Sequence, residues 1–521
     1  MIPFGLQTRL WWREASLIER RLAVSALAMA MALVVVAVVP ALSGRSNDGV
    51  HVGSEAGGTF EETAGEGGGP AGPDGVAGGA PGGADGAAGT TATGGTRGTS
   101  RSGSATGGTG GGGGGGGGPV TLRASDRGVT ADTVKIGFVI INLAGVAEAG
   151  IVANLRDDTD KVIDALVADA NARGGVHGRR IVPVKREVDI LSLDDQNRKC
   201  TQFADEEKVF AVLDVGAFAN ATTRACLTKQ KQTLLFTGQV GTAEEIREAA
   251  PYQTGTMKDD NRKMLDYVRS AQETGFFDPA KGFKKLGILW MNCRDSIINT
   301  PNGLKAYLRQ AGVTSWSEYS MDCDLQSQQR AGPVAQLQFA GDGVTHVLPA
   351  VTTVAINSFL NSAQPQGYKP KYFLSDLLGV TLDSGSRDYN PDQFDGVMAY
   401  TTIHHGDPKA VAAGKRCNDV ITKAPHNLPP ITDYGRDLEA LTLCDHLEQF
   451  LLAAGKAGPN PTRRSLGEAI GTSGEMRPSV VNYARFDRPG KLTGGDSLSP
   501  ATWRRDCRCW RHVGPFRPAY G

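Results

Sequence analysis

VKIGFVII, residues 134–141, opens the stretch of sequence that decides the fold, and NARGGVHGRRI, residues 171–181, closes it. The first segment is apolar apart from one lysine, which is typical of a strand buried in a parallel sheet. Apolar residues then recur at helical spacing: Leu155, Val162, Ile163, Leu166, Val167 and Ala170. Gly174 and Gly175 end this helix. The stretch therefore predicts a strand, a helix and a return to a second strand.

The same alternation continues along the chain in two series. The first series adds strands at 181–184, 209–213 and 233–237 and helices at about 194–206 and 220–230. The second begins with the helix of Met264, Tyr267, Val268 and Ala271 and adds strands at 285–291, 346–351 and 371–375 and helices at 304–311, 334–339 and 354–360. Strands alternating with helices in this way predict an α/β fold of two Rossmann-like lobes with parallel sheets.

Composition limits the folded part and its partners. The chain has 521 residues, 69 of them Gly, and residues 53–118 are mostly Gly, Ala, Thr and Ser, which cannot build a core. About 400 residues remain after Val120, enough for two medium domains. Lys plus Arg and Asp plus Glu both total 55, so the formal net charge is zero. Nucleic-acid binders carry a basic excess, so no nucleic-acid partner is predicted.

The N-terminal region predicts a membrane segment. Residues 22–42 are uncharged and long enough to cross a bilayer, and Arg9, Arg13, Arg20 and Arg21 precede them. The positive-inside rule places residues 1–21 in the cytoplasm and the folded part on the extracytoplasmic side of the cell membrane. A cleaved signal segment, with a cut site at 41–43 and a secreted product, is the alternative, and the length of the span favours a retained anchor. Residues 43–130 then form a disordered Gly-rich linker.

All eight cysteines follow this segment, on the side where disulfides persist. Cysteines that are neighbours in the sequence are the preferred bridges, namely Cys200 with Cys226 and Cys293 with Cys323. The pairing of the other four stays open: Cys417, Cys444, Cys507 and Cys509.

No metal site or cofactor is predicted. Cys507 and Cys509 with His512 lack the second ligand pair that a structural zinc site needs. His404 and His405 are adjacent, and adjacent residues on a strand point to opposite faces, so they do not share an ion.

The turn at 171–181 resembles the helix-to-strand turn of type I periplasmic binding proteins, the branched-chain amino-acid binding branch in particular. DEEKVFAV, residues 205–212, is similar to the entry to that family's third strand, and FDRPGK, residues 486–491, to the hairpin before its last strands. The resemblance runs from about residue 131 to residue 516. It implies a hinged cleft between lobe 1, at 131–255 and 397–485, and lobe 2, at 256–396 and 486–521.

The family binds its ligand in the cleft, on loops that correspond here to 216–222 and 237–242. This chain has Ala217, Phe218, Ala219 and Asn220 where the amino-acid binders commonly offer serines. In the second lobe Asp376 lies where the family often has an acidic partner for an ammonium group, and a helix-capping or exposed aspartate is the equal alternative. Phe218 either stacks on a ligand or packs in the core. The candidate ligand-binding residues are Asn142, Phe218, Asn220, Thr222, Gln239, Thr242, Asp295, Thr352 and Asp376.

The resemblance implies a solute-binding protein of an ABC-type uptake system, with a small polar solute as ligand and a transporter permease as partner. None of the common hydrolase, phosphate-loop, metalloprotease or dinucleotide motifs occurs, so no enzyme activity is predicted. The alternative is a membrane-anchored ectodomain of the same fold that senses a ligand or scaffolds partners without delivering cargo.

Overall fold

The sequence VKIGFVII forms an interior strand of the first sheet in this computed structural model, which describes residues 121–142, 155–218 and 220–520. The predicted cytoplasmic segment, the apolar run at 22–42, nearly all of the linker and Ala219 lie outside the described residues. Of the described helices, none combines the length and the hydropathy that a membrane crossing requires.

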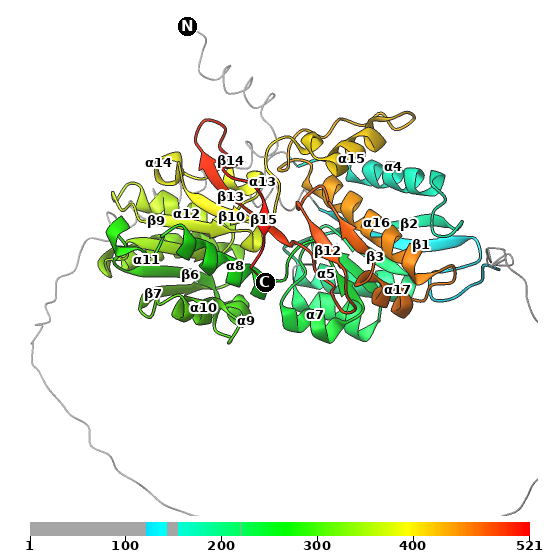
Figure 1. Cartoon of the computed structure of the whole chain (residues 1–521), viewed down its shortest axis with the longest axis horizontal. Helices are drawn as coiled ribbons and strands as arrows, with labels where there is room; N and C mark the ends of the chain where they lie inside the picture. The colour runs from blue at the N-terminus through cyan, green and yellow to red at the C-terminus, as the bar shows by residue number, and fades with distance from the viewer. Residues whose placement is uncertain (1–120, 143–154, 219, 521) are drawn as a thin grey trace, which may run out of the picture. The chain divides into compact units, whose positions relative to one another are not determined.

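Lobe 1 is built on a five-stranded parallel sheet with strand order β2-β1-β3-β4-β5. Figure 1 labels β2, β1 and β3 of this sheet. Its strands are β1 (Thr133–Ile141), β2 (Arg180–Val188), β3 (Ala211–Asp214), β4 (Leu234–Thr237) and β5 (Gln253–Thr254). Its helices are α4 (Thr159–Ala172), α5 (Leu193–Thr201), α6 (Ala221–Ala225), α7 (Ala243–Ala249), α15 (Ala412–Thr422), α16 (Leu438–Ala457) and α17 (Arg463–Ile470). Phe210, just before β3, and Phe236 of β4 pack edge-on against Phe450 of α16. The first predicted series is therefore confirmed as a parallel α/β lobe.

Lobe 2 is built on a larger, mixed sheet with strand order β14-β13-β10-β9-β8-β6-β7, and β15 pairs with β13. Its strands are β6 (Leu286–Met291), β7 (Trp316–Met321), β8 (His346–Ala350), β9 (Lys371–Ser375), β10 (Met398–Thr401), β13 (Ser497–Arg504), β14 (Cys509–His512) and β15 (Arg517–Pro518). The strands from β10 to β7 are parallel, and β13 and β14 are antiparallel to their neighbours.

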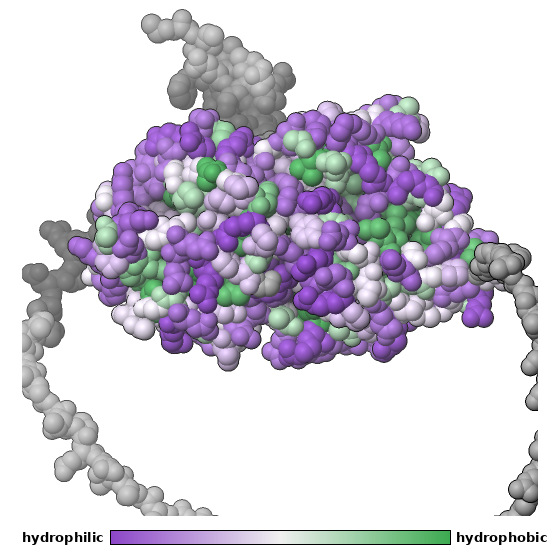
Figure 2. Space-filling model, in the orientation of Figure 1, coloured by the Kyte–Doolittle hydropathy of each residue, from purple (hydrophilic) through white to green (hydrophobic). Residues whose placement is uncertain are grey.

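The helices of lobe 2 cover the sheet and leave a core rich in aromatic residues. They are α8 (Asp260–Glu273), α9 (Asp295–Ile298), α10 (Leu304–Gln310), α11 (Leu325–Gly341), α12 (Thr353–Ala363), α13 (Asp383–Ser386) and α14 (Pro391–Phe394). Phe394 contacts Trp503 and Trp510, and both tryptophans are fully buried. The face of the molecule shown in Figure 2 is mostly hydrophilic, because the apolar side chains of both lobes are gathered in their cores.

Within the described residues the chain passes between the lobes three times: from β5 to α8, from β10 towards α15, and from the hairpin of β11 (Gly474–Met476) and β12 (Ala484–Phe486) to β13. The crossings run side by side. Gly255 bridges to Thr493 and Ile403 to Val481, and the Asn482 N–H donates to the Thr402 carbonyl at 3.1 Å. Backbone pairing at the junction therefore joins the three connections into one hinge.

Two predicted boundaries between the lobes differ from the observed ones. β10 pairs in parallel with β9, so the first part of lobe 2 extends to Thr401, beyond residue 396. Phe486 and Leu492 are buried in the core of lobe 1, and the return to lobe 2 comes only with β13. Both differences have the same cause, since a strand of four residues and a short hairpin leave little periodic pattern in the sequence.

Three disulfides are present among the described residues. Cys200–Cys226 and Cys293–Cys323 are the two predicted bridges, and Cys507–Cys509 is the third. Cys417 and Cys444 are free and buried.

Candidate functional site

The carboxyl edge of the lobe 1 sheet is organised by Asp214, the last residue of β3. Its buried carboxylate accepts hydrogen bonds from the Thr237 hydroxyl at 2.7 Å and from the Ala217 N–H at 2.9 Å. Burial raises the pKa of Asp214. Thr237 is the last residue of β4, so the Asp214 side chain fixes the loops that follow both β3 and β4.

Four predicted ligand residues in these loops serve the local structure. Phe218 is fully buried in the lobe 1 core, and its carbonyl accepts from Arg224 at 3.0 Å. Asn220 caps α6 by accepting from the exposed Thr222 N–H at 2.7 Å. Thr242 caps α7 by accepting from the Glu245 N–H at 3.1 Å. The side-chain oxygens of Asn220 and Thr242 are thus already engaged.

The remaining two predicted residues of lobe 1 lie at strand ends. The Asn142 N–H, just after β1, donates to the Val188 carbonyl at 2.9 Å. Gln239 is half-buried after β4, and its N–H donates to the Thr237 hydroxyl at 3.0 Å. Both stand at the edge of the sheet where a ligand is expected.

The predicted residues of lobe 2 are spread along its carboxyl edge. Asp295 is exposed at the start of α9, and Thr352 precedes α12 and donates its hydroxyl to Gln328. Asp376 is buried after β9, where its carboxylate accepts from the Thr402 N–H at 2.6 Å and from the Thr402 hydroxyl. Asp376 is therefore not exposed, and although it precedes the 3-10 helix at Leu377–Gly379, its side chain makes no capping hydrogen bond there. Its carboxylate holds the second crossing in place.

Glu439, at the start of α16, is a buried acidic group that the sequence analysis missed. Its Oε2 accepts from the Thr159 hydroxyl at 3.1 Å, and the Ile141 N–H faces the carboxyl group and lowers its pKa. Its Oε1 makes no hydrogen bond of its own among the described residues. Burial raises the pKa of Glu439 to about 7, and the charge of Asp214 adds to the shift. The residue is 4% exposed. A buried carboxyl oxygen without a hydrogen-bond donor is unusual in a folded protein. It indicates that a group other than the described residues donates to this oxygen.

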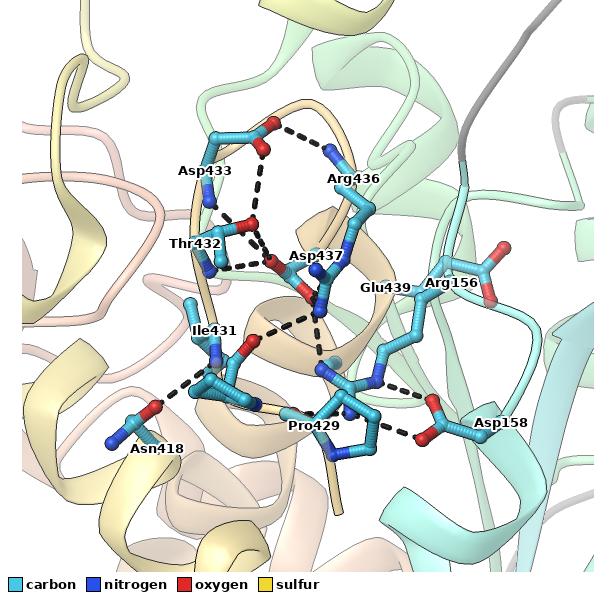
Figure 3. Close-up of polar contacts among 12 residues, drawn as sticks. Arg156, Asp158, Asn418, Pro429, Ile431, Thr432, Asp433, Arg436, Asp437 and Glu439 are labelled. Atoms are coloured by element: carbon cyan, nitrogen blue, oxygen red, sulfur yellow. Dashed lines mark hydrogen bonds and ion pairs between the residues drawn. The ribbon is translucent and has the colours of Figure 1, made fainter.

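Arg156 organises the polar network beside Glu439 (Figure 3). The buried guanidinium pairs with Asp437 at 2.9 Å and with Asp158, and it donates to the Pro429 carbonyl at 2.6 Å. The other carboxylate oxygen of Asp437 accepts from the Thr432 N–H at 2.8 Å. These bonds tie the loop at 429–437 to the segment that precedes α4.

The same loop touches lobe 2. Asp433 lies 3.8 Å from Arg387, which follows α13. Gly435 approaches Ser384 so closely that a Cβ at this position would lie 2.9 Å from the Ser384 nitrogen.

A second point of contact lies at the start of α8. The Asp260 N–H donates to the Gly241 carbonyl of lobe 1 at 2.9 Å, and the Asp260 carboxylate lies 3.6 Å from Arg294 of lobe 2. The carboxyl edges of the two sheets therefore approach each other at both points.

A surface cavity of about 410 Å³ lies at the opposite edge of the lobe 2 sheet, where β8, β9 and β10 begin at His346, Lys371 and Met398. Parallel sheets bind ligands at their carboxyl ends, so this cavity is not part of the candidate site.

The sequence does contain a feature that could have indicated Glu439. Glu439, Asp445 and His446 are buried within the largely apolar helix α16, where ionisable residues are rare unless they are paired or functional.

The chain is similar in sequence and in fold to proteins whose class is known. A family described as "Periplasmic binding protein" matches residues 133–473. A possible leucine/isoleucine/valine-binding protein from Rhodopirellula baltica SH 1 is 17% identical with a TM-score of 0.54, over 74% of this chain and 96% of that chain. No curated protein matches this chain.

Two further solved structures hold different ligands. The branched-chain amino acid transporter substrate binding protein of Streptococcus pneumoniae, in complex with isoleucine, is 15% identical with a TM-score of 0.51, over 74% of this chain and 100% of that chain. A solute binding protein of an ABC transporter from Rhodopseudomonas palustris BisB5, in complex with 3,4-dihydroxy benzoic acid, is 15% identical with a TM-score of 0.51, over 74% of this chain and 98% of that chain. At these identities the structures establish the fold alone.

Proposed function

Because this chain belongs to the periplasmic binding protein family, we propose that it binds a small polar solute between its lobes and delivers it to an ABC-type uptake system. One observation carries the proposal: the two sheets approach each other at the carboxyl ends of their parallel strands and are joined by three adjacent crossings. Such edges bind ligands, and such a junction permits hinge closure. Membership in a family of binding proteins agrees with the lack of enzyme motifs.

The acidic edge of lobe 1 supports a solute that carries an amine or another strong hydrogen-bond donor. The unpaired Oε1 of Glu439 needs such a donor, because a buried polar group without a partner costs about 1–3 kcal/mol. Asn220 and Thr242 use their side-chain oxygens as acceptors in the caps of α6 and α7, so these oxygens do not compete with Glu439 for a donor on the solute. We propose that three uncharged side chains contact the solute, namely Asn142, Gln239 and Thr352. We propose that two exposed residues lie at the rim of the binding site, namely Thr222 and Asp295.

Native mass spectrometry of the purified full chain, followed by calorimetry, tests the proposal. We expect a co-purifying small molecule, and we expect amino acids or amines to bind in a calorimetric panel. Glu439→Gln should weaken an amine-bearing ligand at least tenfold, or about 1.4 kcal/mol. Glu448→Gln on the same helix is the control, since Glu448 pairs with Arg173 and Arg416 at the surface. A folded protein that binds nothing in the panel would rule the function out.

We propose that residues 22–42 retain the protein at the membrane, with the folded lobes on the extracytoplasmic side. Support comes from the length of the apolar run and from the arginines before it. Membrane fractionation with mass analysis of the mature N-terminus tests this. A chain that begins after Ser43 and appears in the soluble fraction would show cleavage.

The same anchor also supports an alternative, in which the lobes sense a solute without delivering it. Transport assays in cells separate the two functions. Deleting the gene should abolish uptake of the identified solute if the protein delivers it, and should leave uptake unchanged if the protein only senses it.

A further inference from the structure

The hairpin of β13 and β14 carries a disulfide of unusual spacing at its tip. Arg504 pairs with Cys509 in the register of the two strands, and residues 505–508 form the loop between them. Cys507 lies in this loop and is bonded to Cys509, two residues away. The other two disulfides have sequence separations of 26 and 30.

This bridge adds little to the stability of the fold. In the chain-entropy account, the stabilisation by a disulfide grows with the loop it closes, so a separation of two gives the least. The base of the hairpin is held by other groups. The Trp510 N–H donates to Asp383 at 2.8 Å, and the indole N–H of Trp503 donates to the Ser386 carbonyl at 3.1 Å. The hairpin is therefore anchored without the bridge.

The backbone between the two cysteines is strained. Arg508 has a φ of 49°, in the left-handed region that residues other than glycine rarely adopt. Its guanidinium donates to the Arg387 carbonyl at 2.7 Å. Opening the small ring would let Arg508 return to an ordinary conformation, which favours reduction of this bridge over the larger ones.

Access and charge also favour reaction at this bridge. Cys507 is exposed, whereas Cys509 is 6% exposed. Four arginines and one aspartate are neighbours of the pair in the sequence: Arg504, Arg505, Asp506, Arg508 and Arg511. Arg504 pairs with Asp506, and Arg505 pairs with Asp392 and Asp395. Among the described residues Arg508 and Arg511 have no ion-pair partner, so they supply the positive charge beside the bridge. Positive charge attracts an incoming thiolate and stabilises the leaving thiolate. Cys507 is therefore the sulfur open to attack, and Cys509 is the leaving group.

We propose that Cys507 and Cys509 form a redox-active pair that exchanges with thiols of other molecules. An external thiolate attacks Sγ of Cys507, the Cys507–Cys509 bond breaks, and its electron pair leaves on Sγ of Cys509, which takes up a proton. A second external thiolate then attacks the external sulfur of the mixed disulfide and releases Cys507, which is protonated in turn. Two external thiols are oxidised to one disulfide, and the cysteine pair gains two electrons and two protons. The reverse sequence oxidises the pair.

Graded reduction of the full chain under native conditions tests the proposal. Dithiothreitol is added, samples are quenched with iodoacetamide, and labelled cysteines are mapped by mass spectrometry. We expect Cys507 and Cys509 to be labelled at least tenfold faster than Cys293 and Cys323, a matched control because Cys293 is also exposed on lobe 2. Equal or slower labelling of Cys507 and Cys509 would overturn the proposal.

Single substitutions test the roles of the two sulfurs. With oxidised glutathione, Cys509→Ser should form a mixed disulfide on Cys507 at least tenfold faster than Cys507→Ser forms one on the buried Cys509. Equal rates would contradict the assignment. Arg511→Gln, at an exposed position of β14, removes an arginine without an ion-pair partner among the described residues and should slow the reduction of the pair several-fold, whereas an unchanged rate would remove the role of charge. Parallel reactions with reduced glutathione and with a reduced, unfolded protein show whether small or protein thiols exchange faster.

Discussion

Buried carboxyl groups in lobe 1 differ in how fully their oxygens are bonded. Asp214 accepts from Thr237 and from backbone N–H groups. Asp445 accepts from the Ser479 and Val480 N–H groups at 2.6 and 3.0 Å, and burial raises its pKa to about 7. Glu439 keeps one oxygen without a partner among the described residues. Asp214 and Asp445 are thus accounted for by the fold, whereas Glu439 is the residue that a ligand would complete.

Glu439→Gln should change how stability depends on pH. The pKa of Glu439 rises from 4.5 to about 7 on folding, so between these values the folded state binds more protons than the unfolded state. The contribution of Glu439 is therefore full below about pH 4.5 and is lost as the pH rises through 7. Glutamine cannot titrate, so the variant should match the wild type near pH 4 and exceed it by about 3 kcal/mol near pH 9. Urea unfolding at several pH values measures this, and a difference independent of pH would contradict it. Glu468→Gln, exposed on α17, is the control.

Asp376→Ala should destabilise the protein by about 1–3 kcal/mol, because it leaves the buried Thr402 N–H and hydroxyl without their acceptor. Asp376→Asn keeps one acceptor oxygen and should cost less. Urea unfolding compares the two variants. An alanine variant as stable as the wild type would show that Thr402 finds another partner. In calorimetry, unchanged affinity for an amine ligand in the asparagine variant would remove Asp376 from the binding site.

At the scale of elements, the buried parallel strands were predictable because they read as continuous apolar runs, as in β1, β6 and β9. β7 was missed because its sequence, WSEYSM, is mostly polar at the edge of the sheet, and β10 was missed because it has only four residues.

The candidate site was harder to predict than the fold. Asn220 and Thr242 belong to residue types that both bind ligands and cap helices, and only the structure shows that they cap α6 and α7. Arg156 bonds to Asp437 (Figure 3), and Thr159 bonds to Glu439, in both cases between distant parts of the chain, so no local spacing in the sequence indicates these contacts.

The Cys200–Cys226 bridge joins α5 to the turn that follows α6, and its removal should destabilise lobe 1. The bridge has a sequence separation of 26, and the chain-entropy account gives about 3.5 kcal/mol for a loop of that size. Replacing both cysteines by alanine should lower the free energy of unfolding by about that amount in urea. Replacing Cys507 and Cys509 by alanine should cost much less, since that bridge closes the smallest loop. Equal losses from the two double variants would contradict the entropic account.

At the scale of the whole molecule, ion pairs hold the hinge together where the crossings meet. Asp496, just before β13, pairs with Arg262 of α8 at 2.8 Å and with Lys491 at 2.7 Å. Lys258 and Asp266 form a buried pair beside them. These contacts lie at the hinge itself, so motion of the lobes should affect mainly the contacts farther from it, such as the one between Asp433 and Arg387.

Gly435→Ala should separate the lobes at that contact. The added Cβ would lie 2.9 Å from the backbone nitrogen of Ser384, and the loop that carries it is held by the Arg156–Asp437 pair, so the clash is not relieved by a small shift of a side chain. Overpacking of this kind costs about 1–3 kcal/mol. Hydrogen exchange followed by mass spectrometry should therefore show faster exchange at 383–387 and 432–436, with little change in the cores of the two lobes. Gly455→Ala on α16, where a Cβ meets no atom within 4 Å, should leave exchange in both segments unchanged. If Gly435→Ala also leaves them unchanged, the loop at 429–437 moves independently of lobe 2 and does not take part in closure.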